Sequence, residues 1–193
     1  MGALAVQPQT IDDLYAIPEA ERYHELLAGE IVPKASPSFR HSRAQRRLGS
    51  RLDSFDRKPR GPKDPGGWWI VVEPDVQLAP HTLVRPDVAG WRREHLPEPP
   101  ERTPIQGAPD WICEVLSRSN AAVDLLDKVR IYHRANIAHY WILDPERQTL
   151  RVHRWTPTGY QVILDAASDE RVRAEPFELL DLLVLSLFDD EDT

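Results

Sequence analysis

The chain has 193 residues, which favours a single domain because domains usually contain about 100–200 residues. Hydrophobic residues make up 41% of the sequence and charged residues 28%, a balance that excludes a disordered or fibrous chain. The formal net charge of -7 argues against a protein that coats nucleic acid through its overall field, and the single cysteine, Cys113, excludes a disulfide framework or a zinc site built from several thiolates.

The sequence also predicts where the protein resides. No apolar run approaches the ~20 residues of a membrane span, and the N-terminus, MGALAVQPQT, lacks the basic start and long apolar stretch of a secretory signal. We therefore expect a cytoplasmic protein with no membrane partner, formed by one domain over residues 1–188 and an acidic, disordered tail at residues 189–193.

The N-terminal part predicts a helix, a hairpin and a longer helix. Thr10 can cap a helix that reaches Tyr15, and HELLAGEIVPK (residues 24–34) predicts a strand or a hairpin around Gly29. The longer helix, residues 39–55, follows the capping sequence SPS. Its apolar residues recur at spacings of three and four and predict a buried face: Ala44, Leu48, Leu52 and Phe55. An adjacent face carries three arginines: Arg43, Arg47 and Arg51.

The rest of the chain predicts mainly strands. WWIVVEPDVQLAP and TLVRPDVAGW, on either side of Pro80 and His81, predict a hairpin, and a proline-rich connection follows at residues 92–109. WICEVLS and HYWILD predict buried strands joined by a helix that begins at Ser119 or Asn120 and reaches about Ala135. This strand–helix–strand order indicates an α/β fold with a parallel or mixed sheet. Residues 149–164 predict a final hairpin.

Glu114 is the most informative residue, because a carboxylate stands in the middle of an apolar strand. A buried ionised carboxylate requires a cation or a metal ion as its partner. Asp87 lies inside the preceding strand-like run, and two converging carboxylates favour a hard cation such as Mg²⁺ or Mn²⁺ between them. The alternative is structural: Glu114 pairs with an arginine such as Arg85 or Arg130.

Lys128 is a third candidate, on the helix that follows the Glu114 strand. Asp124, Lys128 and Tyr132 fall four residues apart, so they share one helix face that can lean over the end of the sheet. The alternative is an ordinary surface pair between Asp124 and Lys128, which the residue pattern alone favours.

Several segments together resemble the Uma-two family of predicted restriction endonucleases, which belongs to the PD-(D/E)XK nuclease superfamily. They cover most of the chain from Tyr23 to Tyr160: YHELLAGEIVPKASPSFRH, VRPDV, IQGAPDWICEVLSRS, DLLDKVRIYHRANIAHYWILDPE and LRVHRWTPTGY. The resemblance implies a restriction-endonuclease-like mixed central sheet flanked by helices, with extra antiparallel hairpins. It also selects Asp87 over the competing Asp75 and Asp110, which are interpreted as turn or strand-edge residues.

The resemblance also implies the site residues. Asp87 and Glu114 hold a divalent metal together with the Val115 carbonyl, and Lys128 replaces the lysine that the superfamily places two residues after the acid, where this chain has Leu116. Glu30 and, as the second choice, Glu25 match acidic positions of the family's opening motif, and either can complete the metal shell or position a water.

This chemistry predicts a metal-dependent endonuclease that hydrolyses DNA phosphodiester bonds without an organic cofactor. The residues expected to hold the nucleic acid backbone lie on the helix over residues 39–55: Arg40, His41, Arg43, Arg47 and Arg51. Cutting both strands favours a homodimer. The alternative is a catalytically inactive module of the same fold that binds nucleic acid or a protein partner, and a solvated helix face is the alternative for the arginines. The sequence leaves the choice between DNA and RNA open.

Overall fold

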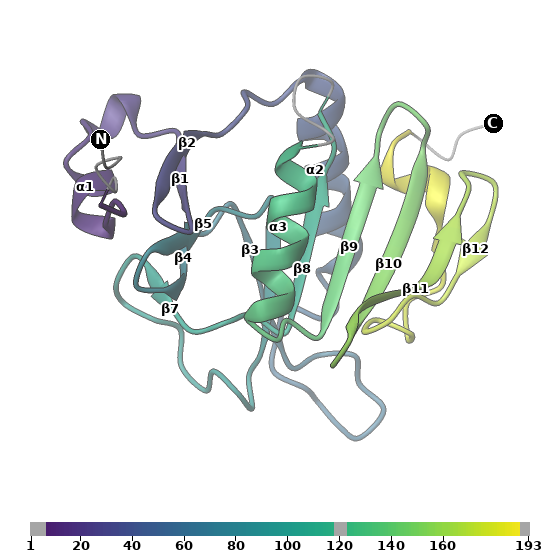
Figure 1. Cartoon of the computed structure of the whole chain (residues 1–193). Helices are drawn as coiled ribbons and strands as arrows, with labels where there is room; N and C mark the ends of the chain where they lie inside the picture. Colours follow the sequence, from purple (N-terminus) through teal and green to yellow (C-terminus); the bar gives the residue numbers. More distant parts are fainter. Residues whose placement is uncertain (1–6, 118–122, 190–193) are drawn as a thin grey trace.

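The computed structural model describes residues 7–117 and 123–189, and for residues 123–125 only the backbone. It has a mixed α/β fold in which a six-stranded sheet, a smaller five-stranded sheet and a two-stranded sheet are combined with a few helices (Figure 1). The expected cap at Ser119 or Asn120 and residues 190–193 of the expected tail lie outside the described part of the chain. Within that part, no helix has the length and apolar character needed to cross a membrane.

The six-stranded sheet forms the centre of the fold. Its strands are, in spatial order, β11 (Gly159–Ala166), β10 (Thr149–Thr156), β9 (His139–Asp144), β8 (Trp111–Val115), β6 (Val88–Arg92) and β3 (Trp68–Val72). Strands β8 and β9 run parallel, whereas the other neighbouring pairs are antiparallel. The helix α3 (Val123–Arg134) connects the parallel pair, as the strand–helix–strand pattern predicts.

The five-stranded sheet lies beside the first and is built from short strands. In spatial order these are β2 (Glu30–Pro33), β1 (His24–Leu27), β5 (Thr82–Val84), β4 (Val76–Ala79) and β7 (Ile105–Gln106). The remaining elements are α1 (Ile11–Tyr15), η1 (Glu19–Glu21), α2 (Phe39–Leu52), η2 (Val184–Leu187) and a two-stranded sheet of β12 (Arg171–Val172) and β13 (Leu182–Leu183).

Local sequence signals explain the N-terminal elements. Thr10 and Asp13 form a reciprocal capping box at the start of α1, and the side chain of Ser38 accepts a hydrogen bond from the His41 amide at the start of α2. The hairpin of β1 and β2 turns through Ala28 and Gly29, whose φ angles of 51° and 91° lie in the left-handed region that favours glycine. The helix α2 ends at Leu52, three residues earlier than the sequence pattern predicts.

The two β-rich runs around the Pro80–His81 turn each divide into two strands. Strands β4 and β5 form the expected hairpin in the smaller sheet, whereas β3 and β6 pair with each other in the central sheet. The divisions fall at Pro74 and Pro86, which have no N–H group to donate to a strand ladder. Asp87 follows the second of these prolines, so it lies where the chain passes from one sheet to the other.

The central sheet is covered on both faces, because side chains alternate along its strands. Trp111, Cys113 and Val115 of β8 pack in the core that contains the apolar face of α2. Ile112 packs in a second core that contains Tyr132 of α3. Glu114 lies on the same face of β8 as Ile112, which is the face that α3 covers. A carboxylate on this covered face requires polar partners.

Leu48 tests how α2 packs. It is completely buried among the residues of the first core. We expect Leu48→Ala to lower the free energy of unfolding by about 2–5 kcal/mol, because the substitution leaves a cavity. Urea denaturation measures this change. Ser50→Ala, at an exposed position of the same helix, is the control and is expected to change the free energy by less than about 0.5 kcal/mol. Equal, small effects of both substitutions would contradict this packing.

Candidate functional site

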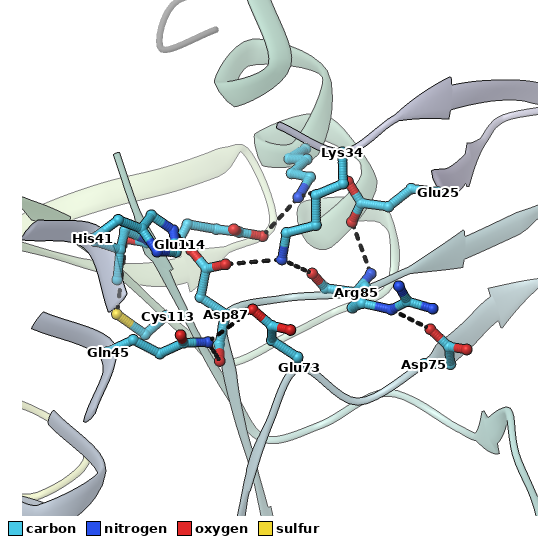
Figure 2. Close-up of polar contacts among 12 residues, drawn as sticks. Glu25, Lys34, His41, Gln45, Glu73, Asp75, Arg85, Asp87, Cys113 and Glu114 are labelled. Carbon is cyan, nitrogen blue, oxygen red and sulfur yellow. Dashed lines mark hydrogen bonds and ion pairs between the residues drawn. The ribbon is translucent and has the colours of Figure 1, made fainter. Parts of the chain in front are cut away.

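A cluster of charged side chains lies where the ends of β6 and β8 meet β1, α2 and α3 (Figure 2). We call it the carboxylate–lysine cluster. Its members are Glu25, Lys34, His41, Asp87, Glu114, Lys128 and Tyr132. All seven side chains are buried or nearly so, and the side chain of Lys34 retains only 9% of its accessible surface.

The carboxylate of Asp87 contacts β8, α2 and the residue that follows β2. Its Oδ2 atom accepts hydrogen bonds from the Val115 amide at 2.7 Å and from Nε2 of His41 at 3.0 Å. Its Oδ1 atom lies 2.8 Å from Nζ of Lys34. Since Val88 pairs with Cys113 in the antiparallel ladder, Asp87 and Glu114 are the next residues at the same end of the two strands.

The protonation state of Asp87 follows from these contacts. Burial alone would raise the pKa of this carboxyl group, but the hydrogen bond from His41 and the positive charge of Lys34 outweigh it and hold the pKa well below its usual range. Asp87 is therefore ionised at neutral pH. The main chain of Asp87 is also held in place, because Nε2 of Gln45 donates a hydrogen bond to the Asp87 carbonyl oxygen at 2.8 Å.

Glu114 is held from the opposite side by α3. Its Oε1 atom lies 3.1 Å from Nζ of Lys128 and accepts a hydrogen bond of 2.5 Å from the hydroxyl of Tyr132. The two partners are four residues apart and so lie on one face of α3, as the sequence pattern predicts. Nζ of Lys128 also lies 2.9 Å from Oε2 of Glu25, whose other oxygen accepts a hydrogen bond from the Arg85 amide at 2.7 Å.

Burial and the neighbouring charges shift the pKa values of Glu114 and Lys128 in opposite directions. Burial raises the pKa of Glu114, and the ammonium of Lys128 only partly offsets this effect. Burial would lower the pKa of Lys128, but the carboxylates of Glu114 and Glu25 outweigh it and raise the pKa above its usual value. Lys128 is therefore a permanent cation between two carboxyl groups and is buried rather than on the surface. The side chain of Asp124, its alternative partner, lies outside the described part of the chain.

Lys34 is the member that sequence reasoning misses. It follows β2 directly, and its amide donates to the Tyr23 carbonyl at 2.9 Å, which fixes the main chain beside β1. Figure 2 shows its side chain reaching toward Asp87 and Arg85, and its Nζ atom lies 2.6 Å from the Arg85 carbonyl oxygen. Burial would lower the pKa of Lys34, but the charges of Asp87 and Glu114 raise it above its usual value. No spacing in the sequence signals this contact, because Lys34 and Asp87 are 53 residues apart.

The structure places the other candidates differently from the sequence interpretation. Glu25, and not Glu30, joins the cluster: Glu30 is exposed at the start of the edge strand β2, opposite Leu27. The partner of Glu114 is a lysine rather than an arginine, since Arg85 pairs with Asp75 at 2.7 Å and Arg130 is exposed. Position along the hairpin explains the first difference, because Glu30 stands beside the turn in the edge strand β2, whereas Glu25 lies away from the turn in β1, between β2 and β5.

The predicted backbone-binding residues of α2 divide into two groups. His41 is buried, with 5% of its surface exposed, and its ring contacts Asp87 instead of facing outward where a phosphate could reach it. The arginines Arg40, Arg43, Arg47 and Arg51 remain half-buried or exposed along α2. Arg43 contacts the C-terminal segment, with its Nε atom 3.3 Å from the Phe188 carbonyl and its guanidinium 3.8 Å from Asp189.

These arginines concentrate positive charge on one side of α2. The pKa of Arg47 lies below its usual value because of desolvation and because of the nearby charges of Arg43, Arg46 and Arg51.

The competing aspartates that follow prolines have local roles: Asp75 pairs with Arg85, and Asp110 accepts a hydrogen bond from the Arg92 amide at 2.7 Å.

The donor set is compatible with a hard divalent cation. Asp87 and Glu114 offer carboxylate oxygens at one end of neighbouring strands, the ligand type that Mg²⁺ and Mn²⁺ prefer. A cation already stands at this place, because the ammonium of Lys34 lies on Asp87 Oδ1. Among the described residues, no group of three or more His, Cys, Asp or Glu side chains is arranged so that it could hold a metal ion. The oxygen donors of Asp87 and Glu114 thus fit a divalent ion by their chemistry, while Lys34 contacts Oδ1 of Asp87 in this structure.

Comparisons with known proteins bear on the family and the fold of the chain. A sequence model of the Uma2 family, described as "Putative restriction endonuclease", matches residues 11–184. A crystal structure at 1.96 Å resolution of "a putative nuclease belonging to DUF820" from Anabaena variabilis ATCC 29413 has a similar fold. Its TM-score is 0.73 at 24% identity, and the match covers 94% of this chain and 98% of that chain. None of the curated proteins compared with the chain matches it.

Lys128→Met tests whether the positive charge of this lysine offsets the cost of burying the carboxylates of Glu25 and Glu114. The substitution leaves Glu25 and Glu114 without their shared cation, so we expect the free energy of unfolding to fall by about 3–5 kcal/mol at neutral pH. Urea denaturation measures the loss. Arg130→Met on the same helix removes an equal charge from an exposed pair with Asp127 and is expected to cost less than about 1 kcal/mol.

The loss caused by Lys128→Met is also expected to depend on pH. The pKa of Glu114 is already raised, and it rises further without the ammonium. A carboxyl group whose folded pKa exceeds its unfolded pKa contributes stability below the unfolded pKa and loses it as pH rises through the folded pKa. The free energy of unfolding of the variant, relative to that of the unmodified protein, should therefore be lower at about pH 8 than at about pH 5. A difference that is independent of pH would contradict this explanation.

Proposed function

The chain belongs to the Uma2 family, and from this premise we propose that it is a metal-dependent endonuclease that hydrolyses phosphodiester bonds in DNA. One observation carries the proposal: Asp87, Glu114 and Lys128 meet in one buried cluster, although three separate segments of the chain contribute them. Buried charges at the ends of strands are costly to maintain, and such groups concentrate at functional sites.

The groups that would hold Mg²⁺ or Mn²⁺ are the carboxylates of Asp87 and Glu114 and the main-chain carbonyl of Val115. When bound there, a divalent ion supplies positive charge to the phosphate oxygens and lowers the pKa of the attacking water. The chain itself supplies the orientation. The Val115 amide and His41 both hold Oδ2 of Asp87, which directs the other oxygen, Oδ1, toward the site.

Lys128 contributes charge rather than proton transfer. Because its pKa is raised above the usual value of a lysine, the side chain stays protonated and does not act as a general base at neutral pH. Its ammonium can stabilise the negative charge that develops on the phosphate, and it fixes Glu114 and Glu25 at the same time. The hydroxyl of Tyr132 supports the same orientation of Glu114.

The arginines of α2 are the proposed contacts to the DNA backbone. Arg40 and Arg43 lie on the helix that also presents His41 to Asp87, so a phosphate chain bound along α2 would lead to the carboxylate–lysine cluster. Contacts of this kind position a duplex without reading its sequence. Because each chain carries one such cluster, cleavage of both strands of a duplex favours a homodimer.

Asp87→Asn and Glu114→Gln test the metal site with little change in shape. In the unmodified protein we expect Mg²⁺ or Mn²⁺ to raise the melting temperature and to support nicking of supercoiled DNA, since an ion that binds only the folded state stabilises it. Each variant should lose both responses. A variant that still cuts DNA in the presence of Mn²⁺ would contradict the assignment of that carboxylate.

Arg43→Ala combined with Arg47→Ala tests the proposed DNA surface. We expect weaker retention of duplex DNA and a salt dependence of binding that is shallower by about one unit for each phosphate that the variant no longer neutralises. Binding titrations at several salt concentrations measure both quantities. Arg171→Ala combined with Arg173→Ala removes the same charge from exposed positions near Asp181 and should leave the binding unchanged.

A second candidate function is a nuclease-fold module that binds nucleic acid without cutting it. Two observations favour it: Leu116 stands at the position of the superfamily lysine, and ammonium groups already neutralise Asp87 and Glu114. This candidate predicts DNA retention that survives Asp87→Asn and Glu114→Gln, weakens without the α2 arginines, and is not accompanied by cleavage in Mg²⁺ or Mn²⁺.

A further inference from the structure

The ammonium of Lys34 contacts Oδ1 of Asp87, the carboxylate oxygen that is directed into the carboxylate–lysine cluster. The Val115 amide and His41 hold Oδ2, whereas Oδ1 contacts the ammonium of Lys34 at 2.8 Å. A divalent ion bound by Asp87 at Oδ1 would therefore occupy the same place as this ammonium. The two cations cannot share it, because like charges at contact distance repel strongly inside a protein.

The balance of charge leads to the same conclusion. The carboxylates of Glu25, Asp87 and Glu114 carry three negative charges when ionised, and the ammonium groups of Lys34 and Lys128 carry two positive ones. Addition of a divalent ion to this set would leave a buried excess of positive charge. If the ammonium of Lys34 withdraws, the three carboxylates and Lys128 leave two negative charges, which match a divalent ion.

The ammonium of Lys34 still has a hydrogen-bond acceptor when it moves away from Asp87. Nζ of Lys34 also contacts the Arg85 carbonyl oxygen at 2.6 Å, so it can leave Asp87 and keep this hydrogen bond. The main chain of Lys34 stays fixed meanwhile by its hydrogen bond to Tyr23. Asp87 likewise keeps both contacts to Oδ2. Only the Lys34 side chain has to move.

We propose that Lys34 is an internal competitor of the divalent ion: its ammonium occupies the metal position on Asp87, and the protein binds metal only when this ammonium is displaced. Lys34 is thus a positioning residue that sets the affinity of the site for metal, and it keeps the cluster close to neutral in the absence of metal. This inference rests on the proposed function, because it requires that Asp87 binds a metal ion.

Calorimetric titration of the full-length protein with Mn²⁺ alone tests the inference. Lys34→Met keeps the length and the apolar stem of the side chain but removes the ammonium. Because the ion then no longer competes with it, we expect Mn²⁺ to bind Lys34→Met about tenfold or more tightly than the unmodified protein. Lys34→Gln, which also lacks the charge but retains a hydrogen-bond donor, is the second variant if Lys34→Met folds poorly, and the same gain is expected.

Thermal denaturation provides an independent readout. Without metal, Lys34→Met should melt at a lower temperature than the unmodified protein, because Asp87 loses its cation. Saturating Mn²⁺ should raise the melting temperature of the variant by more than it raises that of the unmodified protein. Lys63→Met is the matched control: it removes one positive charge from an exposed lysine in another loop and should leave the affinity for Mn²⁺ unchanged.

The possible outcomes separate this inference from the proposed function. Equal or weaker Mn²⁺ binding by both Lys34 variants, with clear binding by the unmodified protein, would overturn the role of Lys34 and leave the nuclease proposal standing. An equal gain in Lys34→Met and Lys63→Met would also overturn it, because general electrostatics would then be the cause. Absence of Mn²⁺ binding in all of these proteins would overturn both proposals.

Discussion

Three carboxyl groups are buried at one point of this fold, and their need for positive charge determines the arrangement around them. Isolated ionised carboxylates cannot be buried without a large free-energy cost, so each requires a cation or several hydrogen-bond donors. The structure meets this need with Lys34 at Asp87 and with Lys128 between Glu25 and Glu114. These ion pairs connect both sheets and α3 at one place.

The proposed replacement of a strand lysine by Lys128 has a simple geometric basis. Side chains two residues apart in a strand point to the same face, so Leu116 and Glu114 share the side on which α3 packs. A lysine at either position can reach the same carboxylate, one from the strand and one from the covering helix. The Lys128–Glu114 distance of 3.1 Å shows that a lysine on the helix reaches this carboxylate. Leu116 instead packs against the second hydrophobic core, which also contains Tyr132.

Local patterns in the sequence predict the elements of this fold well, and pairs of distant residues poorly. The capping residues, the apolar face of α2 and the β8–α3–β9 unit follow from periodicity and turn chemistry, because those signals act over a few residues. The residue pattern also indicates Glu114, Asp87 and Lys128 as candidates, and the resemblance to a nuclease family assigns their roles. The contact between Lys34 and Asp87 spans 53 residues and the transition between the two sheets, so no periodicity contains it. The choice of Glu25 over Glu30 likewise depends on the position of each residue in the sheet, because Glu30 stands beside the turn in the edge strand and Glu25 lies in the neighbouring inner strand.

The burial of His41 shows why a positive residue on a helix cannot be assigned to a nucleic acid surface from sequence alone. His41 lies one position after Arg40 and two before Arg43, yet its ring faces Asp87, because α2 turns by about 100° for each residue. The same helix thus presents two kinds of group: His41 and Gln45 on the side of the cluster, and the arginines on the neighbouring side. The residue type and its place on a helix therefore do not decide its role; the face it occupies does, and the apolar face of α2, which packs in the core, determines which face turns toward Asp87.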